Sequence, residues 1–180
     1  LSAKLPSWKI KKYEDMETIF ESQLKDLQTD SVDFYMLHHL NEEYWKMFRE
    51  LDVFEWMDEL LSSGRVKHMG FSAHTEMDWI VDIVDDYDKF EFGLTQLNYL
   101  DERYQSGREG VEYLSSQGLG TMIMEPLRGG TLVQNVPQDI MELWDMAEEK
   151  RTPVEWAFQY LWNMEEVDVV LSGMNSIDQI

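Results

Sequence analysis

The chain has 180 residues, of which 43% are hydrophobic and 13% aromatic. This is too much apolar surface for a disordered chain, and the length suits one globular domain over residues 1–180. Acidic residues number 36 against 15 basic ones, giving a formal net charge of −21, which argues against nucleic acid or a membrane surface as a partner. The lack of cysteine excludes disulfides and thiolate-held metals or clusters within these residues, and fits a cytoplasmic protein.

Short strand patterns alternate with amphipathic helix patterns along the whole chain, which indicates parallel βαβ construction. The first strand is predicted at residues 1–4. The helix after it has apolar residues at helical spacing: Met16, Ile19, Phe20, Leu24 and Leu27. The second strand is predicted at residues 32–37 and ends in His38 and His39. The apolar face of the next helix is Leu51, Phe54, Met57 and Leu61, and Gly64 is placed to end it.

The third strand is predicted at residues 66–71. Thr75 and Asp78 resemble a capping box for the next helix, whose apolar stripe is Ile80, Ile83, Val84 and Tyr87. A fourth strand is predicted near residues 94–97 and a fifth at 121–124, joined by a helix that stops at Gly118. Helices follow around residues 140–147 and from Pro153, the latter with a Thr152 and Glu155 capping box. The sixth strand is predicted at residues 167–171.

The spacing of the strand ends gives the number of βα units that a barrel would have here. These ends are Lys4, His38, Ser72, Gln96, Glu125 and Gly173. An eight-unit barrel of about 250 residues has about 31 residues per βα unit, so the chain would hold six units and lack about two. A doubly wound open sheet has the same alternation, and periodicity alone leaves both folds open. The chain also lacks an initiator methionine and opens directly on a strand end, so we expect it to be truncated.

Lys4 and His38 end consecutive predicted strands. Neighbouring parallel strands lie about 4.8 Å apart, and active sites of barrels form at the carboxyl ends of strands, so both side chains could enter one pocket. Taken singly, Lys4 could be a solvated loop residue and His38 a histidine satisfied at the top of a barrel. The spacing alone does not decide between these interpretations.

Six ordered motifs, covering nearly the whole chain, extend this reading. The tract VDFYMLHH at residues 32–39 resembles the histidine-bearing strand of aldo/keto reductases, and SAKL at 2–5 resembles their lysine-bearing strand. GRVKHMGFS at 64–72, QLNY at 96–99, EPLRGG at 125–130 and SGMN at 172–175 follow in the family's order. The resemblance implies an α/β fold, a partial (β/α)8 TIM barrel with strands 3 to 8 of the eight.

Residues 125–130 and 169–174 are most similar to a microbial branch of this family that usually carries a C-terminal ferredoxin-like extension with a 4Fe–4S cluster. That extension would begin after Ile180 and is absent here. The resemblance therefore implies an iron–sulfur cluster only for a full-length parent protein.

The resemblance also implies hydride transfer between NADP(H) or NAD(H) and an aldehyde or ketone. The family uses a Tyr proton donor, a Lys that lowers the Tyr pKa, an Asp paired with the Lys, and a His that orients the carbonyl. A phenol with a pKa near 10 needs such a cation to act at neutral pH. Lys4 matches the lysine and His38 the histidine, whereas the Asp and Tyr would lie upstream of Leu1. We expect the fragment alone to be inactive.

For the cofactor, the resemblance implies that Ser72 and Gln96 bind the nicotinamide carboxamide. Without it, they would be a loop hydroxyl and a polar filler. Two turns match the pyrophosphate site, and Gln179 matches an adenine contact. The residues of these turns are Leu127, Gly129, Gly130, Leu132, Ser172, Gly173, Met174 and Asn175. The pair Gly129–Gly130 could instead be only a flexible turn.

Three departures from the family pattern bear on the cofactor. Met124 replaces the aromatic residue that often stacks on the nicotinamide, and Ala73 replaces an Asn. The last segment lacks a Lys or Arg to pair with a 2′-phosphate, so NADP and NAD both stay open. The histidines form no metal constellation; His39 and His74 are interpreted as substrate-loop residues and His68 as a strand residue.

Two other functions stay open: a nucleotide-binding barrel without chemistry, acting as a sensor or regulatory subunit, and an unrelated phosphate-binding barrel. An upstream Asp followed four or five residues later by a Tyr would favour the enzyme. A barrel that lacks two strands also leaves unpaired edges, so we expect self-association of this piece. The substrate is expected to be a small carbonyl compound.

Overall fold

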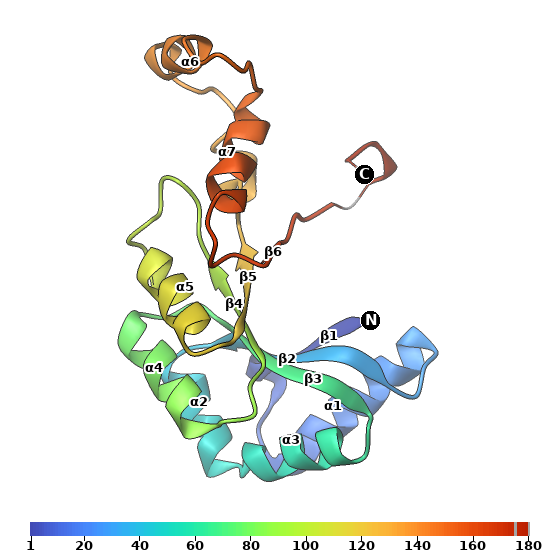
Figure 1. Cartoon of the computed structure of the whole chain (residues 1–180). Helices are drawn as coiled ribbons and strands as arrows, with labels where there is room; N and C mark the ends of the chain where they lie inside the picture. Colours follow the sequence, from blue (N-terminus) through green and yellow to red (C-terminus); the bar gives the residue numbers. More distant parts are fainter. Residues whose placement is uncertain (175, 180) are drawn as a thin grey trace.

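The computed structural model describes residues 1–174 and 176–179. Its six strands form one parallel sheet in which every strand pairs with the next one along the chain (Figure 1). The strands are β1 Ser2–Pro6, β2 Val32–Leu40, β3 Val66–Ala73, β4 Phe92–Gln96, β5 Gly120–Met124 and β6 Val169–Val170. A doubly wound sheet reverses its strand order at a switch point, so the unbroken order indicates part of a barrel, as predicted.

Helices connect the strands and lie outside the sheet (Figure 1). The α-helices are α1 Tyr13–Leu27, α2 Glu42–Glu50, α3 Val53–Ser62, α4 Met77–Asp86, α5 Gly107–Ser116, α6 Gln138–Asp145 and α7 Pro153–Trp162. Three short 3-10 helices are η1 Ser7–Lys9, η2 Arg128–Gly130 and η3 Ile177–Gln179. None of the described helices is long and apolar enough to cross a bilayer.

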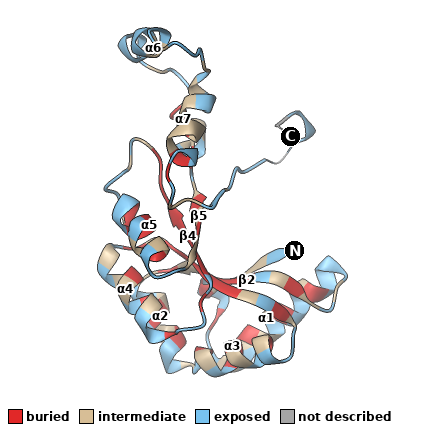
Figure 2. Cartoon of the chain, in the orientation of Figure 1, coloured by how far each residue is buried: buried red, intermediate tan, exposed pale blue. Residues whose placement is uncertain are grey.

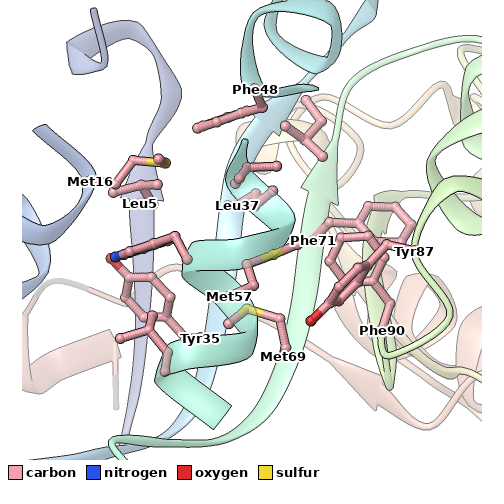
Figure 3. Close-up of a cluster of buried hydrophobic side chains, with 14 of the residues drawn as sticks. Leu5, Met16, Tyr35, Leu37, Phe48, Met57, Met69, Phe71, Tyr87 and Phe90 are labelled. Atoms are coloured by element: carbon pink, nitrogen blue, oxygen red, sulfur yellow. The ribbon is translucent and has the colours of Figure 1, made fainter. Parts of the chain in front are cut away.

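The strand register assigns side chains to two faces. Leu5 pairs with Leu37, Leu37 with Phe71, and Phe71 with Gly93, forming one row across four strands. The residues of this row lie on one face, because successive side chains of a strand point to opposite sides. Figure 3 shows Leu5, Leu37 and Phe71 in a buried cluster with side chains from the helical layer. This outer face holds the main core.

The opposite, inner face carries a second row across the same strands. In this row Lys4 pairs with Met36, Met36 with Gly70, and Gly70 with Phe92. Met36, Phe92 and Leu94 form a smaller apolar cluster with Met122 and Met124. A Cβ at Gly70 would lie 2.5 Å from the Phe92 ring, so the absent side chain gives that ring its place. On this inner face, Lys4 therefore lies at the edge of an apolar cluster.

Burial is uneven along the chain. The buried residues of the main core cluster lie between Leu5 and Leu114 in the chain. A second cluster, between Leu97 and Met164, has only five buried residues. Helix α6 has no buried residue, and it lies far from the sheet in Figure 2, without buried positions. The half of the chain that contains β1–β3 is therefore the better packed half.

Several local expectations were wrong. The segment after β2 holds two helices, α2 and α3, because Asn41 caps a separate helix by accepting from the Tyr44 N–H at 2.9 Å. The predicted capping box of Thr75 and Asp78 does not form, since Glu76 is the N-cap of α4 and makes no side-chain cap bond.

Some boundaries and faces also differ. Leu27 is 42% exposed, and Tyr87 lies beyond the end of α4 although it is buried. Strand β6 is confined to two residues, because only Val169 and Val170 pair with β5. By contrast, the capping box of Thr152 and Glu155 at the start of α7 is confirmed.

Candidate active site

Lys4 and His38 lie on the inner face of neighbouring strands. Lys4 pairs with Met36, and His38 follows Met36 by two residues, so all three side chains emerge on the same side. The Lys4 charge acts on the His38 imidazole, because it contributes to the lowered pKa of that ring. The structure therefore brings the two groups to one rim of the sheet.

The backbone of Lys4 is held by a hydrogen bond, whereas its ammonium group has no ion-pair partner in the described part of the chain. Gln23 of α1 donates to the Lys4 carbonyl at 2.7 Å and accepts from the Tyr35 hydroxyl at 2.8 Å. Among the described residues, no carboxylate forms an ion pair with Lys4. Burial lowers the pKa of Lys4 from its ordinary value. A half-buried cation without a carboxylate is suited to stabilise negative charge on another group.

His38 is held as a neutral imidazole. Burial and, second, the Lys4 charge lower its pKa to about 4, with smaller contributions from His39 and His74. The hydroxyl of Ser7 donates to the His38 carbonyl, and the Trp8 ring lies 5.0 Å from the imidazole, centroid to centroid. A neutral imidazole carries one N–H donor and one acceptor. At neutral pH, His38 can therefore donate a hydrogen bond without transferring a full charge.

This shift has a consequence for stability. The folded pKa of about 4 lies below the ordinary 6.5, so the unfolded chain binds the proton first as pH falls, and His38 lowers the stability progressively between about pH 6.5 and pH 4. We expect His38→Asn to lose less unfolding free energy than the wild type between pH 7 and pH 5 in urea titrations. Equal losses in both proteins, or a His38 NMR titration midpoint near 6.5, would contradict the shift.

Two further histidines join this rim, which the sequence analysis did not foresee as a cluster. His39 has a left-handed φ of 62°, and the β2–β3 register shifts between Leu37 and Leu40. This irregularity places the His39 ring 4.7 Å from the His74 ring. His68 lies elsewhere in β3, where it stacks on Phe34 and its Nδ1 contacts Glu91 Oε2 at 2.8 Å.

Ser72 and Gln96 lie on the same inner face, on the next two strands, β3 and β4. Ser72 pairs with Leu94, and Gln96 follows Leu94 by two residues. Ser72 is fully buried, and its Oγ has no hydrogen-bond partner among the described residues. A hydroxyl donor beside a side-chain amide complements a primary carboxamide, which has one carbonyl acceptor and one NH₂ donor. The two residues thus fit the nicotinamide carboxamide.

A partly buried carboxylate, that of Asp101, lies beside Gln96 and was not singled out from the sequence. Asp101 Oδ2 accepts from Gln96 Nε2 at 3.5 Å and from Asn98 Nδ2 at 3.2 Å, and it lies 3.2 Å from Arg128 Nε. A cavity of about 260 Å³ lies here, lined by Gln96, Asp101 and Arg128 together with His74, Tyr104, Gln105 and Glu125. Asn98, which follows β4 by two residues, was the only sequence signal for this turn.

Only some of the residues predicted to bind the pyrophosphate line a cavity. A cavity of about 450 Å³ is lined by Leu127, Gly129, Gly130, Ser172 and Gly173, among others. Leu132 is nearly buried and Met174 is 51% exposed, and neither lines this cavity. Asn175 lies outside the described residues, and Gln179 is placed only as part of η3.

The turn between the two cavities has unusual backbone. Gly129 and Gly130 have φ of 64° and 90°, a region that glycine adopts without strain. The Gly130 N–H donates to the Leu127 carbonyl at 2.8 Å. The N–H groups of Arg128, Thr131 and Leu132 also donate within the turn. Phosphate oxygens in this cavity would therefore meet the Ser172 hydroxyl and the backbone of Gly173 on its other side.

Comparison with known proteins agrees with this geometry. The profile of the Aldo/keto reductase family matches residues 2–180. The holo form of an aldo-keto reductase from Bacillus halodurans superposes with a TM-score of 0.77 at 20% identity, covering 99% of this chain and 64% of that one. An aldo-keto reductase from Klebsiella pneumoniae in complex with NADPH gives 0.73 at 19% identity, covering 96% and 59%.

At 19–20% sequence identity, the similarity to these solved structures shows the fold alone. Comparison with curated protein sequences gave no significant match. The chain spans about 60% of the length of the solved structures that it resembles.

Proposed function

Because the chain belongs to the aldo/keto reductase family over residues 2–180, we propose that it forms the larger part of an oxidoreductase that reduces an aldehyde or ketone with NADPH or NADH. The observation that carries this proposal is the convergence of Lys4 and His38 on the inner face. Ser72 and Gln96 lie two strands further along the same face. A substrate carbonyl bound between these two pairs would lie close to a hydrogen-bond donor, His38. It would also lie close to a nicotinamide ring held by Ser72 and Gln96.

The dinucleotide, when bound, supplies a hydride to the carbonyl carbon. His38, neutral at physiological pH, donates a hydrogen bond that orients the carbonyl oxygen. Lys4 places a positive charge where negative charge develops and lowers the pKa of a neighbouring proton donor. In the family that donor is a Tyr, and the Lys is paired with an Asp. Within residues 1–180, neither Tyr35 nor Tyr99 occupies the donor position.

For cofactor binding, we propose that Ser72 and Gln96 hold the carboxamide and that the two turns hold the pyrophosphate. The thioether of Met124 would contact the nicotinamide ring in place of an aromatic residue. The roles of Asn175 and Gln179 remain proposals. No Lys or Arg lines the described cavity of about 450 Å³, so the proposal includes NADP(H) and NAD(H) alike.

We expect the purified 180-residue chain to show no NADPH-dependent turnover with simple aldehydes and ketones, because residues 1–180 do not supply the Tyr and Asp. Absorbance at 340 nm measures this directly, and clear turnover would contradict the expectation. The function itself is tested on the full-length parent, where NADPH fluorescence should be quenched on binding and carbonyls should be reduced. Binding without any turnover would favour the sensor or regulatory alternative. Failure to bind either dinucleotide would contradict the proposed cofactor and the reductase function with it.

Three finer points are also proposals. The motifs at residues 125–130 and 169–174 support the branch with a ferredoxin-like extension, whose 4Fe–4S cluster would lie outside this chain. The charge and composition support a cytoplasmic location. Strands β1 and β6 form the two edges of the sheet, which supports self-association of this piece through unpaired backbone groups.

A further inference from the structure

The turn after β4 returns to the end of its own strand. Asn98 Oδ1 accepts from the backbone N–H groups of Leu100 at 3.1 Å and Asp101 at 2.9 Å. Such a side-chain-to-backbone turn is typical of Asn. Its amide also donates to the Glu125 carbonyl at 3.3 Å, which ties the turn to the loop after β5. Asp101 is thereby fixed beside Gln96, with its side chain only 14% exposed.

One oxygen of Asp101 is shared by three donors. Gln96 Nε2, Asn98 Nδ2 and Arg128 Nε all lie within 3.5 Å of Asp101 Oδ2. One of these donors is itself fixed, because the side chain of Asn98 is held by the turn. An ionised carboxylate can only accept hydrogen bonds. An amide that faces this oxygen must therefore turn its NH₂ group toward it.

We propose that Asp101 is a positioning residue that sets the orientation of the Gln96 amide for the nicotinamide carboxamide. The inference rests on the proposed function. An amide can present either its oxygen or its NH₂ to a given neighbour, and its hydrogen-bond partners decide which. Asp101 takes the NH₂ side of Gln96, so the oxygen is left for the ligand. With the Ser72 hydroxyl nearby, the site then offers one acceptor and one donor, matching the carboxamide.

Arg128 supports this arrangement and not the phosphate site. It lines the cavity of about 260 Å³ beside Gln96 and is absent from the lining of the cavity of about 450 Å³. Its partner Asp101 holds it on the nicotinamide side of the turn. The only cation of the Glu125–Gly130 turn thus serves to neutralise Asp101.

The test uses Asp101→Asn in the full-length protein, because an Asn side chain of nearly the same shape can turn either its oxygen or its NH₂ to Gln96. Calorimetry measures the Kd of NADPH and of 2′-phospho-ADP-ribose, which lacks the nicotinamide; NADH and ADP-ribose replace them if the wild type prefers NADH. We expect the Kd of the dinucleotide to rise about tenfold, the value of one lost oriented hydrogen bond. The Kd of the truncated ligand should change less than about twofold, since it makes no carboxamide contact.

Three further variants sharpen the result. Asp101→Glu keeps the carboxylate and should restore most of the affinity. Asp101→Asn combined with Arg128→Gln should leave the loss in place, because the orientation of Gln96 causes it and not an unpaired Arg128. Asp58→Asn is the matched control: it removes a similar carboxylate, paired with Lys89 at 2.6 Å in the helical layer, and should change neither Kd.

The outcomes separate the two proposals. Equal weakening of both ligands in Asp101→Asn, no weakening of either, or recovery in the double variant would overturn the role of Asp101 while leaving the reductase proposal standing. A wild-type protein that binds neither ligand would overturn the proposed function and this inference together.

Discussion

Replacing Lys4 with methionine in the full-length protein is expected to lower kcat for carbonyl reduction by about 10²–10⁴-fold, the range typical of losing assisted proton transfer. The side chain is half-buried on the inner face, and its charge reaches the His38 imidazole. Methionine keeps the length of the side chain and removes the ammonium. Stopped-flow or steady-state absorbance at 340 nm would measure the loss.

The control for this variant lies five residues away. Lys9→Met removes an exposed ammonium from η1 in the same segment and should leave kcat within about twofold, because screened surface charges contribute little. NADPH affinity and the unfolding midpoint should be close to the wild type in both variants. If Lys4→Met keeps most of its turnover, Lys4 has no catalytic role and the proposed mechanism is wrong.

The second large effect concerns stability. Phe71→Ala is expected to lower the free energy of unfolding by about 3–5 kcal/mol, the cost of truncating a buried aromatic side chain. Phe71 is fully buried in the centre of β3, and its ring lies 5.1 Å from that of Phe90 (Figure 3). The cavity would open between the sheet and the helical layer. Urea unfolding followed by circular dichroism gives the difference.

Phe34→Ala provides the comparison on the other face. Phe34 lies in β2 on the inner side, stacked on His68, and is 37% exposed. Because much of its surface already meets solvent, its removal should cost clearly less than that of Phe71. A larger loss for Phe34 than for Phe71 would mean that the main core lies on the inner face, contrary to the register.

The alternation of strand and helix could be predicted because each element carries its own periodic pattern. The placement of Lys4 and His38 on one face of neighbouring strands could also be anticipated, since the period of two fixes their face. The strand ends were predicted too early, because β1 continues to Pro6 and β2 to Leu40. Helix α2 was not predicted, although Asn41 caps it and Trp45 and Phe48 form its buried face.

The rest of the site depends on contacts that sequence periodicity does not encode. The approach of His39 to His74 requires the irregular pairing between Leu37 and Leu40. The role of Asp101 requires the turn at Asn98 to fold back on β4 and the loop after β5 to bring Arg128 to it. Both are long-range consequences of loop conformation, which local pattern does not determine.

The uneven burial has a dynamic consequence. Lys4, His38 and Ser72 lie on β1–β3, which the large core cluster supports. Residues 125–174 belong to a part of the chain with few buried side chains, and α6 has none. Segments with little buried surface open locally at low free energy, while well-packed ones exchange only on global unfolding. The residues proposed to handle the proton thus lie on the well-packed part of the chain. The turns proposed to bind the pyrophosphate lie on the part that a bound dinucleotide would stabilise most.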